Sequence, residues 1–348
     1  MSFKPFPKDR PLRVVQVGCG GMAQGWVDRS VKRKGRIEVV GLVDIKRESA
    51  EKTAEKHGLP GSVVYNTLTE ALKKAQPDAV FDITIPGAHH AVTLEALGAG
   101  CHVLGEKPLA ESLPQAREMC AAAQKAQRLY MVTQNRRYIP AIIGFRNALK
   151  DGAIGELSSI DADFFIGAHF GGFRDVMPHV LLIDMAIHSF DQGRFISGCD
   201  PVSAYCYEYN PKGSWYKQDS AAIVIFEMSN GVVFTYRGSW CAEGFNTSWE
   251  CSWRAVGSKG TILWDGSNEA KGQRVEGSEG FIRPIKDFAV PSVPIQHGGH
   301  DGVLEEFLSS LYEGKDPQTV CTDNIKSLAM CLAAVESAHK KQRVKVEW

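Results

Sequence analysis

The chain has 348 residues, more than one hydrophobic core usually holds, so its length alone predicts two domains. Hydrophobic residues make up 44% and charged residues 23%, as in soluble globular proteins, and 40 basic residues balance 40 acidic ones. A formal net charge of zero argues against electrostatic recruitment of nucleic acid or of an anionic membrane surface. We therefore expect a small-molecule partner.

The order of elements predicts the first domain. From residue 12 to about 135, short β-branched runs alternate with longer amphipathic stretches. The predicted strands are 14–17, 39–43, 63–65, 79–85, 102–104 and 130–132, and the predicted helices are 24–34, 47–57, 69–75, 89–98 and 114–127. Alternating strands and helices predict a doubly wound parallel sheet, a Rossmann fold, over residues 1–135, with its ligand at the carboxyl ends of the strands.

After Pro140 the pattern becomes that of an α+β domain over residues 136–348. Asn230-Gly231 and Lys259-Gly260 are hairpin signals between strand-like runs, which predicts a large, mostly antiparallel, open sheet. The predicted strands are 158–166, 202–209, 221–228, 232–240 and 249–256, the predicted helices are 180–195, 303–313 and 324–340, and a short last strand is expected at 344–346. The glycine-rich stretch 268–296 is interpreted as long loops.

Cysteine and histidine spacing predicts no metal site. The nine cysteines are scattered without a C-x-x-C pair, which favours reduced buried thiols over a disulfide framework or a zinc site. His89 and His90 are adjacent in sequence and would not easily share an ion on one helix face. The chain shows no apolar run of about 18 residues, and Met1 to Lys8 lacks the apolar core of a signal peptide, so we expect a cytoplasmic protein.

The most informative motif is Gly18-Cys19-Gly20-Gly21-Met22-Ala23, which follows the first predicted strand. In this G-x-G-x-x-A pattern Gly18 permits a tight turn, Gly20 lets bare backbone approach a pyrophosphate, and Ala23 lets the helix pack on the strand. Asp44 lies 21 residues beyond Ala23, near the usual spacing of the acid that binds the ribose hydroxyls. The motif predicts a bound nicotinamide dinucleotide; the alternative is a tight turn without a ligand.

Asp44 also bears on the choice between the two nicotinamide cofactors. A carboxylate accepts hydrogen bonds from a ribose diol and repels a 2′-phosphate, so we expect NAD. Lys46 and Arg47 follow closely and keep NADP as the alternative.

Two further motifs carry ionisable groups. Glu106-Lys107-Pro108 ends the fifth predicted strand, where a lysine can place a donor near a reacting carbinol. On the internal helix, Asp184, His188 and Asp191 fall within roughly 60° of one another at 100° per residue. A carboxylate beside an imidazole suits proton transfer near neutral pH. Surface ion pairs are the alternative for both motifs.

Five segments together resemble one family. They are Gly18 to Ala23, Pro86 with His90, Ala99 to Pro108, Asn135 to Pro140, and Asp184-x-x-x-His188-x-x-Asp191. In this order, across residues 12–195, they look like the Gfo/Idh/MocA family of glucose–fructose oxidoreductases and inositol dehydrogenases. The C-terminal half resembles the family only in its pattern.

The resemblance implies roles for individual residues. Lys107 would contact the nicotinamide ribose and the substrate, and Asp184 with His188 would supply the acid–base pair. Residues at the cofactor would be Gly18, Gly20, Gly21, Met22, Ala23, Asp44, Pro86, His90, Glu106, Lys107 and Asn135. Arg137 and Tyr138 would lie near the site entrance and contact substrate. The second domain would bind the substrate and form a homodimer or homotetramer.

These observations favour an NAD-dependent dehydrogenase that transfers hydride between nicotinamide and a carbinol carbon of a sugar, cyclitol or polyol. One alternative is an NAD-dependent glycoside hydrolase with tightly bound cofactor and transient oxidation of its substrate. Another is a non-catalytic nucleotide sensor, against which Lys107, Asp184 and His188 argue. The sequence does not identify the substrate.

Overall fold

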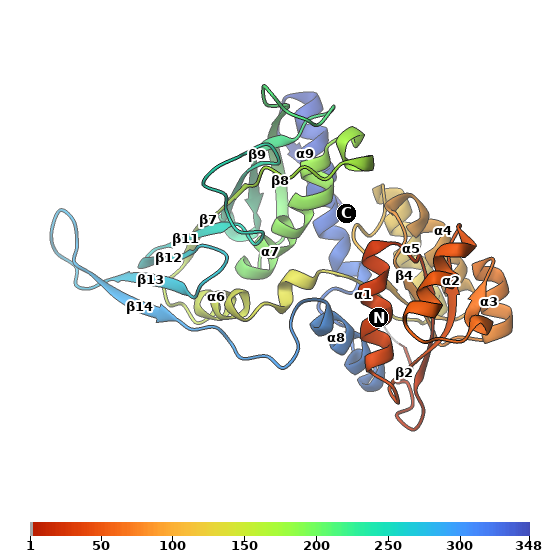
Figure 1. Ribbon diagram of the computed structural model, residues 1–348. Coiled ribbons are helices and arrows are strands. Elements are labelled where there is room, and N and C mark those ends of the chain that lie inside the picture. The colour runs from red at the N-terminus through yellow and green to blue at the C-terminus, as the bar shows by residue number, and fades with distance from the viewer. Residues whose placement is uncertain (1–2) are drawn as a thin grey trace. The chain divides into compact units, whose positions relative to one another are not determined.

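A computed structural model describes residues 3–348, which divide into two compact units (Figure 1). The first unit combines Met1–Thr133 with His300–Ile325, and the second combines Gln134–Gly299 with Lys326–Trp348. The sequence-based division had assigned everything after residue 135 to the second domain, whereas residues 300–325 group with the first unit. The functional assignment of the two domains stays a prediction.

The first unit contains a six-stranded sheet in the order β3-β2-β1-β4-β5-β6, with every pair parallel. Its strands are β1 Leu12–Val17, β2 Ile37–Val43, β3 Val64–Tyr65, β4 Ala79–Asp82, β5 His102–Gly105 and β6 Tyr130–Val132. Its helices are α1 Gly21–Lys32, α2 Arg47–Lys56, α3 Leu68–Ala75, α4 Pro86–Gly98 and α5 Leu113–Ala126, with a 3-10 turn at Gly61–Val63. The predicted Rossmann sheet is confirmed, and its strand order reverses between β1 and β4, where such sheets bind ligands.

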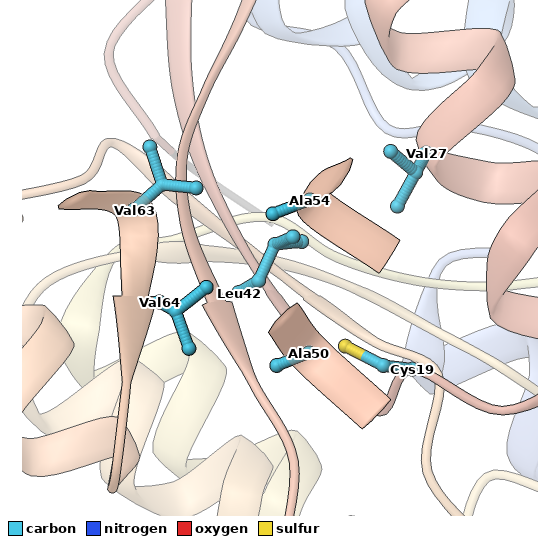
Figure 2. Packing of buried hydrophobic residues seen from close by; sticks show 7 residues of the cluster. All are labelled: Cys19, Val27, Leu42, Ala50, Ala54, Val63 and Val64. Atoms are coloured by element: carbon cyan, nitrogen blue, oxygen red, sulfur yellow. The ribbon is translucent and has the colours of Figure 1, made fainter. Parts of the chain in front are cut away.

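Small residues bring helix α2 close to strand β2 (Figure 2). Ala50 and Ala54, one turn apart on α2, lie beside Leu42 of β2, and both alanines are at most 2% exposed. The remaining members of the cluster are Cys19, Val27, Val63 and Val64. Because Cys19 lies in the glycine turn and Val27 on α1, this packing also fixes the start of α1.

Residues 300–325 follow the long segment of the second unit in the chain but belong to the first unit. Helix α8, Gly299–Glu313, brings Phe307 against Phe81 of β4 with ring centroids 5.8 Å apart. Arg33 binds Asp301 and Glu305 at 2.8 Å each. The first unit is therefore completed by a late part of the chain.

The second unit contains a nine-stranded sheet in the order β14-β13-β12-β11-β7-β10-β9-β8-β15. Its strands are β7 Leu157–Phe165, β8 Pro201–Tyr209, β9 Ala221–Met228, β10 Val233–Ser239, β11 Ser252–Gly257, β12 Gly260–Trp264, β13 Ala270–Val275, β14 Ile285–Val290 and β15 Val344–Lys345. Among the described strand pairs of this second sheet, only β7 and β10 are parallel, so the predicted mostly antiparallel sheet is confirmed.

The interpretation of residues 268–296 as loops was wrong, because β13 and β14 pair antiparallel there. A Cβ built at Gly272 would lie 2.1 Å from the ring of Phe288, its partner across the two strands. The aromatic ring therefore covers bare backbone. In the sequence, a strand glycine that an aromatic ring covers cannot be distinguished from a glycine in a loop.

The predicted internal helix has two parts. Leu181–Ala186 is a π-helix, and α7, Ile187–Ser197, continues it as an α-helix. Phe190 of α7 packs on Phe226 and Tyr236 of the sheet, with ring centroids 4.8 and 5.3 Å away. This packing defines the covered face of the sheet.

The remaining elements complete the second unit. Helix α6, Pro140–Lys150, was not predicted, and α9, Cys321–Lys340, contains the boundary between the two units. Short 3-10 turns lie at Asn135–Tyr138, Gly172–Val176 and Ser229–Gly231. Within residues 3–348, every helix is too short or too polar to cross a membrane.

Buried His102 of β5 makes the stability of the first unit depend on pH. Its Nδ1 accepts a hydrogen bond from the Leu129 N–H at 2.9 Å, and burial lowers the pKa of His102 to about 4. Between pH 4 and the usual histidine value near 6.5, the unfolded chain binds one more proton than the folded chain. The contribution of neutral His102 is thus fully present above about pH 6.5 and is lost as the pH falls toward 4.

We expect His102→Asn, whose amide oxygen can accept the same N–H bond, to flatten this dependence. From pH 6 to 5 the wild-type free energy of unfolding should fall by about 1 kcal/mol more than that of the variant. Urea denaturation across this range measures the difference. Parallel pH curves for the two proteins would contradict the assignment to His102.

Candidate functional site

The glycine turn between β1 and α1 depends on one close backbone approach. Gly18 has φ +93°, a left-handed conformation, and a Cβ there would lie 2.3 Å from the carbonyl oxygen of Ile83. A side chain would thus meet both an unfavourable backbone angle and a rigid backbone atom. Gly18 therefore places the start of α1 beside the chain that leaves β4.

The start of α1 leaves room for an anion. Gly20 is the N-cap and adopts an extended conformation that any residue accepts. Within the described chain, a Cβ on Gly20 or Gly21 would meet no protein atom within 4 Å. The first turn of α1 carries no acidic residue in the described structure, and no side chain caps the helix, so its first N–H groups stay available to a ligand. These features fit the pyrophosphate of a dinucleotide.

Asp44 is held beside this turn. Its two carboxylate oxygens accept hydrogen bonds from the backbone N–H groups of Cys19 and Lys46, each at 2.8 Å. Arg47, the candidate partner of a 2′-phosphate, donates hydrogen bonds to Glu51 and to Asn66. Asp44 therefore presents a fixed acceptor, as a ribose diol requires.

Glu106, at the end of β5, is a buried acid with aromatic neighbours. Its Oε1 accepts a hydrogen bond from Nε1 of Trp26 at 2.8 Å and lies 3.8 Å from Nε2 of His300. Burial lowers the pKa of His300, although the Glu106 carboxylate opposes the shift. Trp26 of α1 thus orients the residue that precedes Lys107.

A histidine holds the segment after Lys107. Nδ1 of His89 lies 2.8 Å from the carbonyl oxygen of Pro108, and Nε2 lies 3.2 Å from that of Thr84. Thr84 in turn donates through its hydroxyl to buried Asp82 at 2.6 Å. Burial raises the pKa of Asp82, while the charge of His89 opposes this. The backbone beside Lys107 is therefore tied to the loop between β4 and α4.

The second unit holds the other predicted acid–base residues. Asp184 lies in the π-helix and receives Nε and Nη2 of Arg174 at 2.6 and 3.3 Å. His188 is the second residue of α7 and is partly exposed, as Asp184 is. The π-helix changes the angle per residue, so the predicted alignment at 100° per residue does not describe Asp184.

Asp191 is built differently from Asp184. Its carboxylate is buried and accepts two hydrogen bonds from Arg137, each at 2.7 Å. The hydroxyl of Ser327 donates to the same carboxylate at 2.7 Å. Asp191 thus closes a buried ion pair with Arg137, whereas Asp184 is partly exposed and is paired with Arg174.

The comparisons with known proteins decide the family. Residues 12–134 match a model described as an oxidoreductase family with an NAD-binding Rossmann fold, and residues 144–263 match the GFO/IDH/MocA C-terminal domain. The chain belongs to the Gfo/Idh/MocA oxidoreductase family. Its first unit contains the NAD-binding domain of that family, so the predicted cofactor NAD and the enzyme class are confirmed.

Relatives with named activities span nearly the whole chain. 1,5-Anhydro-D-fructose reductase of Ensifer adhaerens is 25% identical, with 95% of this chain and 97% of the relative covered. Inositol 2-dehydrogenase of Rhizobium meliloti (strain 1021) is 24% identical, with 91% and 94% covered. An oxidoreductase from Agrobacterium radiobacter, solved with NAD+, L-tartaric acid and magnesium, has the same fold: TM-score 0.83, 21% identity, 96% and 98% covered.

The structure locates the other predicted site residues without testing their roles. In the first unit, Pro86 begins α4, and His90 lies 2.8 Å from Glu118. In the second unit, Asn135 begins a 3-10 turn in which Arg137 and Tyr138 are buried. The use of Arg137 in the ion pair with Asp191 favours a structural role for it.

Sequence reasoning missed four residues that hold the candidate groups in place. These are Trp26, His89, Arg174 and His300. His89 had been considered only as a metal ligand. The side-chain partners of Trp26, Arg174 and His300 lie 10 to 194 positions away in the chain, and His89 contacts backbone carbonyl oxygens. The spacing of residues in the sequence therefore does not predict these contacts.

We expect Gly20→Ala to weaken NADH binding by about tenfold or more, because its methyl group fills the space open to the pyrophosphate. The melting temperature should change little, since that methyl meets no described protein atom within 4 Å. Fluorescence titration with NADH and thermal unfolding measure the two effects.

Gly98→Ala, at the end of α4, is the matched control. A Cβ there also meets no described protein atom within 4 Å, and we expect unchanged NADH affinity. Equal affinities for the Gly20→Ala, Gly98→Ala and wild-type proteins would show that the start of α1 does not bind the cofactor.

Proposed function

We propose that this chain is an NAD-dependent dehydrogenase that transfers hydride between nicotinamide and a carbinol carbon of a sugar, cyclitol or polyol. The observation that carries the proposal is the pair Asp184 and His188 on one partly exposed helix segment, in a family with an NAD-binding domain. The names of the relatives, an inositol dehydrogenase and an anhydrofructose reductase, support a polyhydroxylated substrate.

In this proposal, Lys107, Asp184 and His188 handle one proton. They take the proton of the substrate hydroxyl as the carbinol carbon loses hydride, which leaves a ketone and NADH. Pro86, His90, Glu106 and Asn135 border the cofactor, and Tyr138 contributes to the substrate side, while Arg137 supports the internal helix through its ion pair with Asp191. Holding the carbon against the nicotinamide supplies much of the remaining rate acceleration.

A screen for NAD reduction across cyclitols, aldoses, glycosides and their keto forms tests this proposal. Accumulation of NADH with one of these substrates supports a dehydrogenase. Cleavage of a glycoside without net NADH would instead support the hydrolase, and binding of NAD without any turnover would support a sensor.

We expect His188→Ala and Lys107→Ala to lower turnover by on the order of a hundredfold, the usual scale of general acid–base catalysis. NADH affinity should stay within a few fold for His188→Ala, since its role is confined to the proton. Lys107→Ala should weaken NADH somewhat if Lys107 touches the nicotinamide ribose. Steady-state kinetics and NADH titration separate these effects.

The control for Lys107→Ala is Lys125→Ala, an exposed lysine in the last turn of α5 in the same unit. Its kinetics should match the wild type. Near-normal turnover of His188→Ala at saturating NAD would show that the internal helix is structural.

We also propose that a second copy of this chain covers the open face of the nine-stranded sheet. Tyr205 pairs with Ile225, and Tyr207 with Ile223, across β8 and β9. Their side chains are 43 to 63% exposed and alternate with buried ones, as expected for a sheet face that packs against another surface. A charge at the centre of such an interface is costly to bury.

Light scattering should report a multiple of 38.2 kDa for the wild type and a shift toward the monomer for Ile225→Lys. Phe245→Lys is the control, because Phe245 is fully exposed but lies outside the sheet. A wild-type mass of one chain at micromolar concentration would overturn the proposal.

A further inference from the structure

The ion pair between Arg174 and Asp184 has an unusual setting for a surface loop. Nε and Nη2 of Arg174 reach separate oxygens of Asp184, at 2.6 and 3.3 Å, in the forked geometry that a guanidinium forms best. The side chain of Asp184 is only 15% exposed and that of Arg174 32% exposed. Such a pair is screened less by water than an exposed one.

Two aromatic rings hold the guanidinium in place. Cζ of Arg174 lies 5.0 Å from the ring centre of Phe170 and 4.7 Å from that of Phe173. Phe170 itself packs edge-on against Trp240, with ring centroids 5.1 Å apart. Cation–π contact on two rings limits the rotamers of Arg174.

The loop that carries Arg174 is tied down on both sides. The carbonyl oxygen of Ala168 accepts hydrogen bonds from Nε1 of Trp215 at 2.9 Å and from the hydroxyl of Tyr216 at 2.5 Å. The carbonyl oxygen of Asp175 accepts one from the N–H of Lys217 at 2.8 Å. Arg174 therefore sits on a loop that hydrogen bonds hold on both sides of it.

The charge balance decides what Arg174 does. Both oxygens of Asp184 face its guanidinium, so one positive charge is already matched by one negative charge. An anionic substrate group would have to compete with Asp184 for this guanidinium. A carboxylate held by a guanidinium, in contrast, keeps its ionised form and its orientation.

We propose that Arg174 is a positioning residue that holds Asp184 ionised and oriented for the proton transfer of this enzyme. This role rests on the proposed function, because Asp184 is one of its acid–base residues. Phe170 and Phe173 serve it indirectly, by holding the guanidinium against the carboxylate.

The kinetic test compares Arg174→Gln with Arg10→Gln. Arg10 of the first unit makes a forked pair with Asp78 at 2.6 and 2.8 Å, and its Cζ lies 4.6 Å from the ring centre of Phe6, so it matches Arg174 in both kinds of contact. We expect Arg174→Gln to lower kcat by about tenfold or more, with KM within about threefold of the wild type. The acid limb of the pH–rate profile should move up by about one pH unit, because Asp184 takes up a proton more readily without its partner. Arg10→Gln should leave kcat, KM and the profile unchanged.

Two further measurements distinguish the loss of a positioning role from misfolding of the Arg174→Gln protein. Arg174→Lys keeps the charge but loses the fork, so its kcat should lie between those of the wild type and Arg174→Gln. Asp184→Asn added to Arg174→Gln should change thermal stability by less than Asp184→Asn does in the wild type, because the pair is already broken.

The outcomes separate this role from the proposed function. An unmoved pH profile, a loss confined to KM, or additive stability effects would overturn the positioning role in an enzyme that still turns over its substrate. A wild type that oxidises none of the screened carbinols would overturn the proposed function and this role with it. A shifted pH–rate profile, together with non-additive effects of the two substitutions on thermal stability, would establish that Arg174 holds Asp184 ionised and oriented.

Discussion

The candidate cofactor site depends on one steric constraint, the contact between the backbone at Gly18 and the carbonyl oxygen of Ile83. Because a Cβ would lie 2.3 Å from that oxygen, the chain turns there without a side chain and with a positive φ. The turn brings the N–H of Cys19 onto Asp44 and starts α1 at Gly21. One small residue thus positions both the start of the helix, the candidate site for the pyrophosphate, and the acid beside it.

Ion pairing gives the two aspartates of the internal helix different chemistry. Asp191 lies inside the second unit and is held by Arg137 and Ser327, so it contributes to packing and specificity of the fold. Asp184 remains partly exposed and is held by Arg174 from a loop. The change from π-helix to α-helix between the two residues alters their relative direction. Equal residue types at regular spacing therefore do not share one function here.

The sequence predicted the structure correctly where residues close in the chain determine a residue's environment. The alternation of runs predicted all six parallel strands, and Asn230-Gly231 predicted the turn between β9 and β10. Prediction failed where distant residues decide the structure. Gly272 is a strand residue because Phe288 covers it, and Asp184 is paired because an anchored loop delivers Arg174. His89 lies next to His90, which was predicted at the cofactor, but only its contact with the carbonyl oxygen of Pro108 shows that it holds the segment after Lys107.

The return of α8 to the first unit has a consequence for how the chain folds during synthesis. Phe81 and Trp26 of the first unit pack against Phe307 and His300, and β6 gains a hydrogen bond from Val132 to Thr319 at 3.0 Å. A nascent chain that has left the ribosome only as far as residue 133 lacks all of these contacts. Its early strands have an incomplete core until residues 300–325 emerge, and the second unit in turn lacks residues 326–348 until these follow.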